Sequence, residues 1–248
     1  MTLTLTPPDH RAPDLATAPL PEAPATRAAA RRRWRRHLFR LALGFAAVLA
    51  IGNLFILAGS ALARSASAPS AVEVPDDVSS IRNFEAIDST LWRGAAPGDD
   101  DYRALAAAGV TTVIDLRAED DLRIPQELLD DLGLTRVAIP IRDGQTPTDE
   151  QVQRFFDALN SSEGTVYLHC GAGVGRTGTM AAAYRVANGG AGWDAMRANL
   201  AVGPPSVEQL VFAASLDAGE RTERPHPALV ALSRTLDAPR RILKSLGG

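Results

Sequence analysis

Cysteine and lysine are almost absent from this chain of 248 residues: Cys170 and Lys244 occur once each. A single cysteine excludes an intrachain disulfide and a zinc site made of four cysteines. A lone cysteine is more often a small core residue than a nucleophile, so its neighbours must decide its role. Because nearly every cation is arginine, the choice of arginine over lysine at one position carries little information.

Positive charge is also missing from most of the chain. The formal net charge is -3, but residues 1–63 hold eight Arg against Asp9, Asp14 and Glu22, which leaves -8 on the remainder. Such an acidic body argues against nucleic acid as a partner. Hydrophobic residues make up 46% and charged residues 22%, which is ordinary for a globular domain with extensions.

Charge is absent altogether from residues 41–63. As a helix this run would extend roughly 34 Å, enough to cross a bilayer. We therefore expect a disordered basic tail at 1–37, a transmembrane anchor or signal at 38–63 and a linker at 64–78. The alternative interpretation of this run is a buried core helix, which its length and its basic flank disfavour.

Cleavage of this segment is a second alternative. Ala61 and Ala63 form a small-x-small pattern, and residues 35–39 (Arg-Arg-His-Leu-Phe) resemble a twin-arginine export motif. The run is long for a signal peptide, so a retained single-pass anchor is favoured. The arginines before it keep the N-terminus in the cytoplasm and place the following domain on the non-cytoplasmic side. Cleavage near Ala63 would secrete that domain instead.

The remaining sequence alternates short apolar strands with helical segments, which predicts an α/β domain at 79–220 around a mostly parallel sheet. A C-terminal tail at 221–248 includes a possible amphipathic helix at 229–246. The expected strands are 81–85, 91–93, 111–116, 135–141 and 165–168; the expected helices are 99–108, 125–132, 148–159, 178–187, 193–200 and 207–216.

The stretch with the clearest chemistry follows the strand at 165–168. Cys170 is separated from Arg176 by five residues, three of them glycine, and a helix opens next. A glycine-rich loop at a strand end can turn its backbone N–H groups inward to bind an anion, and the helix adds its positive end. The same field favours a thiolate at Cys170, and Arg176 can bind a phosphoryl group with two hydrogen bonds.

These residues resemble the protein-tyrosine and dual-specificity phosphatase family, whose signature is His-Cys, five residues, then Arg and Ser or Thr. The match runs from His169 to Thr177, and weaker likenesses at 91–94, 109–117 and 139–144 extend it over about residues 80–216. The resemblance implies a three-layer domain, a central sheet flanked by helices.

The resemblance also implies a mechanism without metal or cofactor. Cys170 attacks phosphorus, Arg176 binds the phosphoryl group, and Asp143 protonates the leaving oxygen and later activates water. Thr177 would donate to the sulfur, and His169 would orient the loop and lower the thiol pKa. The phosphate-binding backbone would come from Gly171, Ala172, Gly173, Val174 and Gly175.

Other polar residues have weaker claims. Asp149 and Asp157 are the rivals of Asp143 for the role of general acid. They are weaker candidates because both fall on an expected amphipathic helix. Asp115 is expected to support Arg117 or a helix terminus. Tyrosine-specific members of the family often place a water-positioning Gln near the end of the domain. Gln209 is instead expected on a helix surface, which puts strict tyrosine specificity in doubt.

Three functions fit this pattern. The first is a phosphatase of dual-specificity type acting on a phosphorylated protein or a small phosphomonoester, anchored in a membrane by residues 41–63. The second is an inositol phosphate or phosphoinositide phosphatase, which the absence of a cation between Cys170 and Arg176 disfavours. The third is an inactive phosphate-binding module, which the intact Cys170, Arg176 and Asp143 disfavour.

Overall fold

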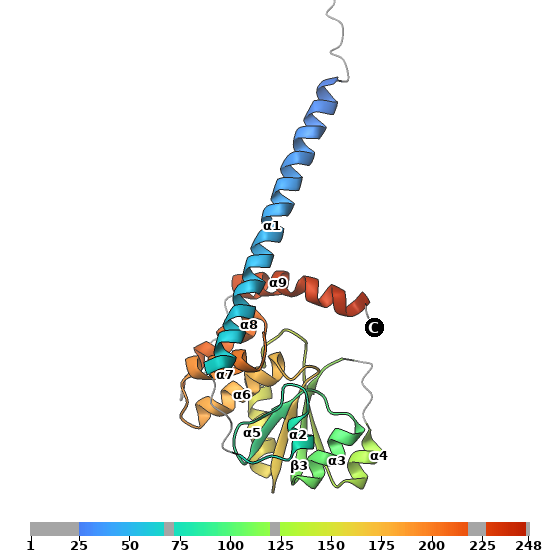
Figure 1. The fold of residues 1–248 in the computed structure, drawn as a ribbon, viewed down its shortest axis with the longest axis vertical. Helices are drawn as coiled ribbons and strands as arrows, with labels where there is room; N and C mark the ends of the chain where they lie inside the picture. Colours follow the sequence, from blue (N-terminus) through green and yellow to red (C-terminus); the bar gives the residue numbers. More distant parts are fainter. Residues whose placement is uncertain (1–24, 67–71, 120–124, 218–226, 247–248) are drawn as a thin grey trace, which may run out of the picture. The chain divides into compact units, whose positions relative to one another are not determined.

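The computed structural model describes residues 25–66, 72–119, 125–217 and 227–246. Residues 1–24 of the tail expected at 1–37, together with parts of the expected linker and C-terminal tail, lie outside these ranges. The chain divides into two units, residues 1–48 and 49–248. The α/β domain lies within the second unit (Figure 1).

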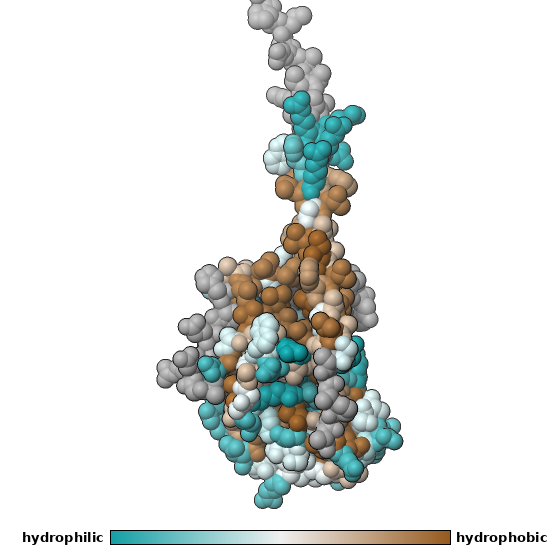
Figure 2. All heavy atoms as spheres, turned by 60° about the vertical axis from the view of Figure 1, so that its left-hand side comes forward, coloured by the Kyte–Doolittle hydropathy of each residue, from teal (hydrophilic) through white to brown (hydrophobic). Residues whose placement is uncertain are grey.

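Helix α1 extends over Ala25–Ala66 and begins before the expected boundary at residue 38, because alanine and arginine are strong helix formers. Figure 2 shows hydrophilic side chains near the start of this helix and hydrophobic ones after them. Its stretch Arg31–Ser65 is long and apolar enough to cross a membrane. A signal sequence near an N-terminus would have the same properties.

The central sheet has five strands in the order β1-β2-β5-β3-β4. Only the short β1 is antiparallel to its neighbour, so the expected mostly parallel sheet is confirmed. The strands are β1 (Glu85–Ala86), β2 (Leu91–Gly94), β3 (Val110–Arg117), β4 (Thr135–Ile141) and β5 (Thr165–His169).

The expected strand at 81–85 is wrong for all but its last residue. Phe84 N donates to Ile81 O at 3.0 Å, which closes a turn instead of pairing with a neighbouring strand. Asn83 has a left-handed backbone with φ of 57°, a conformation incompatible with an extended strand.

Helices cover both faces of the sheet, which confirms the three-layer architecture (Figure 1). One apolar core joins the sheet to α2–α4, and a second core joins it to α5 and α6, on which α7 and α8 pack. The helices are α2 (Asp76–Ser79), α3 (Asp99–Ala107), α4 (Gln126–Asp131), α5 (Asp149–Ser161), α6 (Gly175–Ala187), α7 (Gly192–Val202), α8 (Val207–Ser215) and α9 (Pro227–Leu246).

Two helix starts position the site. Thr148 caps α5 in a reciprocal capping box with Gln151, a feature typically worth about 1 kcal/mol. Helix α6 begins at Gly175 and not at the expected residue 178. The glycine-rich loop after β5 therefore passes directly into the positive end of a helix.

Candidate active site

The candidate site forms where the parallel strands end. Cys170 follows β5, Glu119 follows β3 and Asp143 follows β4. Parallel strands direct their carboxyl ends to the same edge of the sheet, where open α/β sheets bind their ligands. Segments distant in sequence thus supply side chains to a common place.

Cys170 is the buried centre of this place, with only 3% of its surface exposed. Burial raises the pKa of its thiol, but the positive charge of Arg176 lowers it. Hydrogen bonds from Thr177 and from the backbone of Gly173 lower the pKa further, and the net value lies below the ordinary one. The thiolate that a nucleophile requires is therefore favoured here.

Arg176 is almost fully buried, and its guanidinium group is bonded to Ile141 and Glu119. Its Nη1 donates to Ile141 O at 2.9 Å and to a Glu119 carboxylate oxygen at 3.1 Å, while its Nη2 lies 2.8 Å from the other carboxylate oxygen. Its Nε is buried and has no hydrogen-bond partner among the described residues. A donor left in this state is available to an incoming anion.

Sequence reasoning missed Glu119. Its carboxylate forms a two-pronged ion pair with Arg176, and its side chain remains 46% exposed. Burial raises the pKa of Glu119, but the hydrogen bond and charge of Arg176 outweigh this effect and lower it. The sequence gives no sign of this role, because Glu119 stands among other acidic residues in a loop.

Asp143 contacts the same nitrogen of Arg176 as Glu119 does, with 3.5 Å between its Oδ1 and Nη2, and its side chain is 45% exposed. Its two rivals lie on α5, where Asp157 accepts a hydrogen bond from Gln153. The structure thus brings Asp143 next to Arg176, in an exposed position from which a carboxyl group can exchange a proton with a ligand.

The loop that carries Asp143 is tied to the start of α8. Ser206 donates to Gly144 O at 3.1 Å, and Gln209 Nε2 donates to Gln145 O at 3.0 Å. The expectation that Gln209 lies on a helix surface is wrong, since only 3% of it is exposed. Both ends of its side-chain amide are therefore hydrogen-bonded. Nε2 bonds to the loop that carries Asp143, and Oε1 accepts from Ser206 N, the N-cap of α8, at 3.0 Å.

His169 is fully buried behind the loop, with Nδ1 3.3 Å from Cys170 O and 3.9 Å from Asp115 Oδ1. Burial lowers the pKa of His169 to about 4 despite the opposing charge of Asp115. The ring is therefore neutral at neutral pH. The contact fits the expected orienting role, but a neutral imidazole does not supply positive charge to lower the thiol pKa.

Asp115 confirms its expected supporting role. Its carboxylate accepts two hydrogen bonds from the Arg117 side chain and one from Arg136, each 2.9 Å long. Burial raises the pKa of Asp115, but these hydrogen bonds and nearby charges hold it well below the usual range. The group is a fixed anion beneath the site.

The Thr177 hydroxyl is buried without an oxygen or nitrogen partner in the described chain. It lies close enough to the sulfur to lower the pKa of Cys170. Among the described residues, no group of three or more His, Cys, Asp and Glu side chains is arranged to hold a metal ion.

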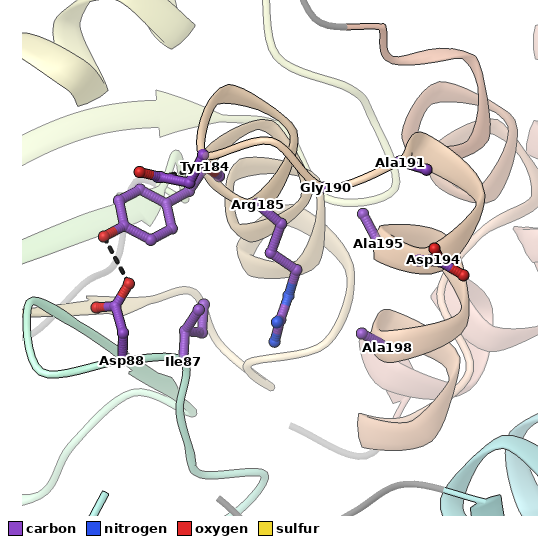
Figure 3. Close-up of a pocket in the computed structure, with 10 residues that line it drawn as sticks. Ile87, Asp88, Tyr184, Arg185, Gly190, Ala191, Asp194, Ala195 and Ala198 are labelled. Carbon is purple, nitrogen blue, oxygen red and sulfur yellow. Dashed lines mark hydrogen bonds between the residues drawn. The ribbon is translucent and has the colours of Figure 1, made fainter. Parts of the chain in front are cut away.

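A hollow of about 320 Å³ lies at the other end of α6 (Figure 3). On its wall, Tyr184 donates a hydrogen bond of 2.7 Å to Asp88. Burial, followed by this hydrogen bond and the charge of Asp88, raises the pKa of Tyr184 to about 12. Asp88 also accepts from the backbone of Thr90 and Leu91, so the pair fixes the turn before β2.

Comparison with known proteins agrees with this geometry. The chain is 43% identical over 77 residues to the dual specificity protein phosphatase CDC14C of Homo sapiens, covering 30% of this chain and 16% of that protein. It is 30% identical over 125 residues to the probable NAD kinase 2, chloroplastic, of Oryza sativa subsp. japonica, covering 45% and 12%. The chain thus spans only 16% and 12% of the lengths of these two relatives.

A solved structure shares the fold. The core catalytic domain of the PP-IP phosphatase SIW14 from S. cerevisiae superposes with a TM-score of 0.50 at 12% identity, over 65% of this chain and 94% of that one. Together with the Cys–Arg loop, these comparisons define a cysteine-dependent phosphatase of the tyrosine and dual-specificity class. The family described as DSP-PTPase phosphatase fused to NAD+ kinase matches residues 71–213. This is more than half of the chain, and the chain belongs to that family.

Proposed function

We propose that this chain hydrolyses phosphomonoesters through a phosphocysteine intermediate, with Cys170 as nucleophile and Asp143 as general acid and base. One observation supports this proposal most strongly: the thiol with the lowered pKa lies beside an arginine whose buried Nε has no hydrogen-bond partner in the described parts of the chain. A phosphoryl group bound to that Nε and to the loop N–H groups would lie next to the sulfur.

In the first step, the Cys170 thiolate attacks phosphorus in line as the bond from phosphorus to the leaving oxygen breaks. Asp143 donates its proton to that oxygen, so a neutral alcohol or phenol departs. In the second step, water attacks phosphorus and loses a proton to Asp143. The sulfur–phosphorus bond breaks, Thr177 donates to the departing thiolate, and inorganic phosphate is released.

The charges around the site favour a phosphorylated protein side chain as the substrate. The loop from Gly171 to Gly175 has no cation, and the partly exposed carboxylates of Glu119 and Asp143 lie beside Arg176. These two negative charges beside the phosphate position would repel a substrate with several phosphates. Because the Gln209 amide is already occupied, we expect dual specificity and not strict tyrosine specificity.

The purified protein should hydrolyse an aryl phosphate in the presence of a metal chelator. Because the pKa of Cys170 is lowered, activity should persist below the ordinary thiol pKa and fall as the pH drops through the lowered value. A panel of phosphotyrosine, phosphoserine and phosphothreonine peptides and inositol phosphates would show the preference. Faster turnover of inositol phosphates would contradict the substrate assignment, and phosphate binding without any turnover would indicate an inactive module.

The chain is further proposed to be anchored in a membrane by residues 41–63, within α1. The support is an apolar stretch preceded by the basic residues Arg31, Arg32, Arg33, Arg35, Arg36 and Arg40. Since positively charged flanks remain in the cytoplasm, the domain after residue 79 is expected on the non-cytoplasmic side.

Protease added to cells without an outer barrier should therefore digest the domain while the membrane is intact. Full protection until the membrane is opened would show the opposite topology. Recovery of the domain in the medium, with a new N-terminus near Ala63, would show that the segment is a cleaved signal. A tag at the N-terminus serves as the internal control, because it should remain protected.

A further inference from the structure

The loop at residues 171–175, called the phosphate loop below, has backbone carbonyl groups that need hydrogen-bond donors of their own. For N–H groups to point inward at an anion, the carbonyls of the same peptide units must point outward into the protein. A buried carbonyl without a donor costs roughly 1–3 kcal/mol. Four consecutive carbonyls, those of residues 171–174, accept hydrogen bonds from donors within residues 82–96, about 80 residues earlier in the chain.

Arg93, on β2, supplies two of these contacts. Its Nη2 donates to Gly173 O at 2.7 Å and lies 3.4 Å from Val174 O, while its Nη1 donates to Asn199 Oδ1 at 2.9 Å. The residue is completely buried, and its nearest carboxylate, on Glu85, is 3.8 Å away. A buried guanidinium is costly unless it is well bonded, and here loop carbonyls provide much of that bonding.

Asn83 supplies the third carbonyl contact. Its Nδ2 donates to Ala172 O at 2.8 Å. Asn83 is the only described non-glycine residue with positive φ, at 57°. Asparagine tolerates this conformation better than most residues, and here the conformation presents a side-chain amide to the loop.

The backbone of the same segment completes the contact. Ala96 N donates to Gly171 O at 3.3 Å, and the exposed Arg82 side chain reaches that oxygen at 3.3 Å. Gly173, with φ of 74°, lies so close to the Gly94 backbone that an added Cβ would be 2.3 Å from its carbonyl carbon. The two backbones are in direct contact.

We propose that these donors form a carbonyl cradle, consisting of Arg82, Asn83, Arg93 and Ala96, that holds the phosphate loop with its N–H groups turned toward the substrate. The cradle residues are positioning residues, since none is placed on the reacting atoms, and their role rests on the function proposed above. Without the cradle, the carbonyls of Ala172 and Gly173 would lose these donors, and the loop peptides would lose their preference for the anion-binding orientation. Val174 O would keep a second donor, Gly178 N at 3.0 Å. Arg93 also contributes a buried positive charge near Cys170 that favours the thiolate.

Alkylation of Cys170 by iodoacetamide tests the cradle without requiring turnover. Its pH dependence reports the thiolate, and protection by inorganic phosphate reports how well the loop binds an anion. Asn83→Gly keeps a backbone that tolerates positive φ and removes only the amide, so we expect about fivefold weaker protection. Arg93→Gln should weaken protection about 10- to 100-fold and shift the alkylation profile to higher pH.

Arg93→Lys retains the charge but cannot reproduce the planar guanidinium contacts. It should restore the pH profile more fully than it restores phosphate protection. Arg82→Gln should have less than about a twofold effect, because this contact is exposed and long. Arg103→Gln, on the exposed surface of α3, is the matched control and should behave as the parent.

Phosphate protection and an alkylation profile equal to the parent in both Asn83→Gly and Arg93→Gln would overturn the cradle. If Arg93→Gln does not fold, Asn83→Gly alone decides by the same criterion. If the parent itself shows neither phosphate protection nor turnover, the proposed function fails, whereas a functional parent with unaffected variants refutes only the cradle.

Discussion

A Cys170→Ser variant is expected to lose turnover entirely while still binding inorganic phosphate. A serine hydroxyl has a pKa far too high to ionise in this loop, so the nucleophile disappears. The loop N–H groups and the buried Nε of Arg176 remain in place to hold the anion. Steady-state kinetics with an aryl phosphate and calorimetric titration with phosphate measure the two properties separately.

Thermal unfolding of this variant serves as the control for its fold. An unchanged thermal transition would show that the loss is chemical, because the substitution changes one buried atom from sulfur to oxygen. Turnover within a few-fold of the parent, in the absence of metal, would contradict the assignment of Cys170. Since Cys170 is the only cysteine, no other thiol in the chain could take its place.

An Asp143→Asn variant is expected to slow hydrolysis by roughly 10²–10⁴ for substrates with poor leaving groups. Phosphate esters of aliphatic alcohols need a proton on the departing oxygen, and asparagine cannot supply one. Aryl phosphates with acidic leaving groups need little protonation and should slow much less. Comparison of an alkyl and an aryl phosphate with the parent and the variant provides the measurement.

Asp149→Asn and Asp157→Asn are the matched controls, because they make the same change on α5, where Asp157 already has a helix partner. Both should retain the leaving-group dependence of the parent. Equal and small effects of Asp143→Asn on both substrates would require a different acid. A large effect of Asp149→Asn would then identify it.

The sequence predicts those parts of the site that are local in the chain. A strand, a loop of five residues and a helix bring Cys170 and Arg176 together whatever the rest of the fold does. Asp143 was expected only from the family resemblance, and the structure places it 3.5 Å from Arg176. Alternating strands and helices were sufficient for the sheet class, because that pattern depends on local periodicity.

The parts that could not be predicted depend on contacts across the sheet. Glu119 gains its role only because β3 and β5 are neighbours, and Gln209 is buried only because α8 meets the Asp143 loop. The neutral state of His169 follows from complete burial, which a sequence motif does not reveal. The turn at 81–84 was mistaken for a strand because its apolar residues gave no indication of the left-handed Asn83.

Trapping of the covalent intermediate tests the central claim most directly. The parent protein, mixed rapidly with an aryl phosphate and quenched in acid, should yield a Cys170 peptide that carries one phosphoryl group, identified by mass spectrometry. The Cys170→Ser variant, treated identically, should yield none. A phosphoryl group on another residue, or a pre-steady-state burst of phenol release without any phosphorylated Cys170, would contradict the mechanism.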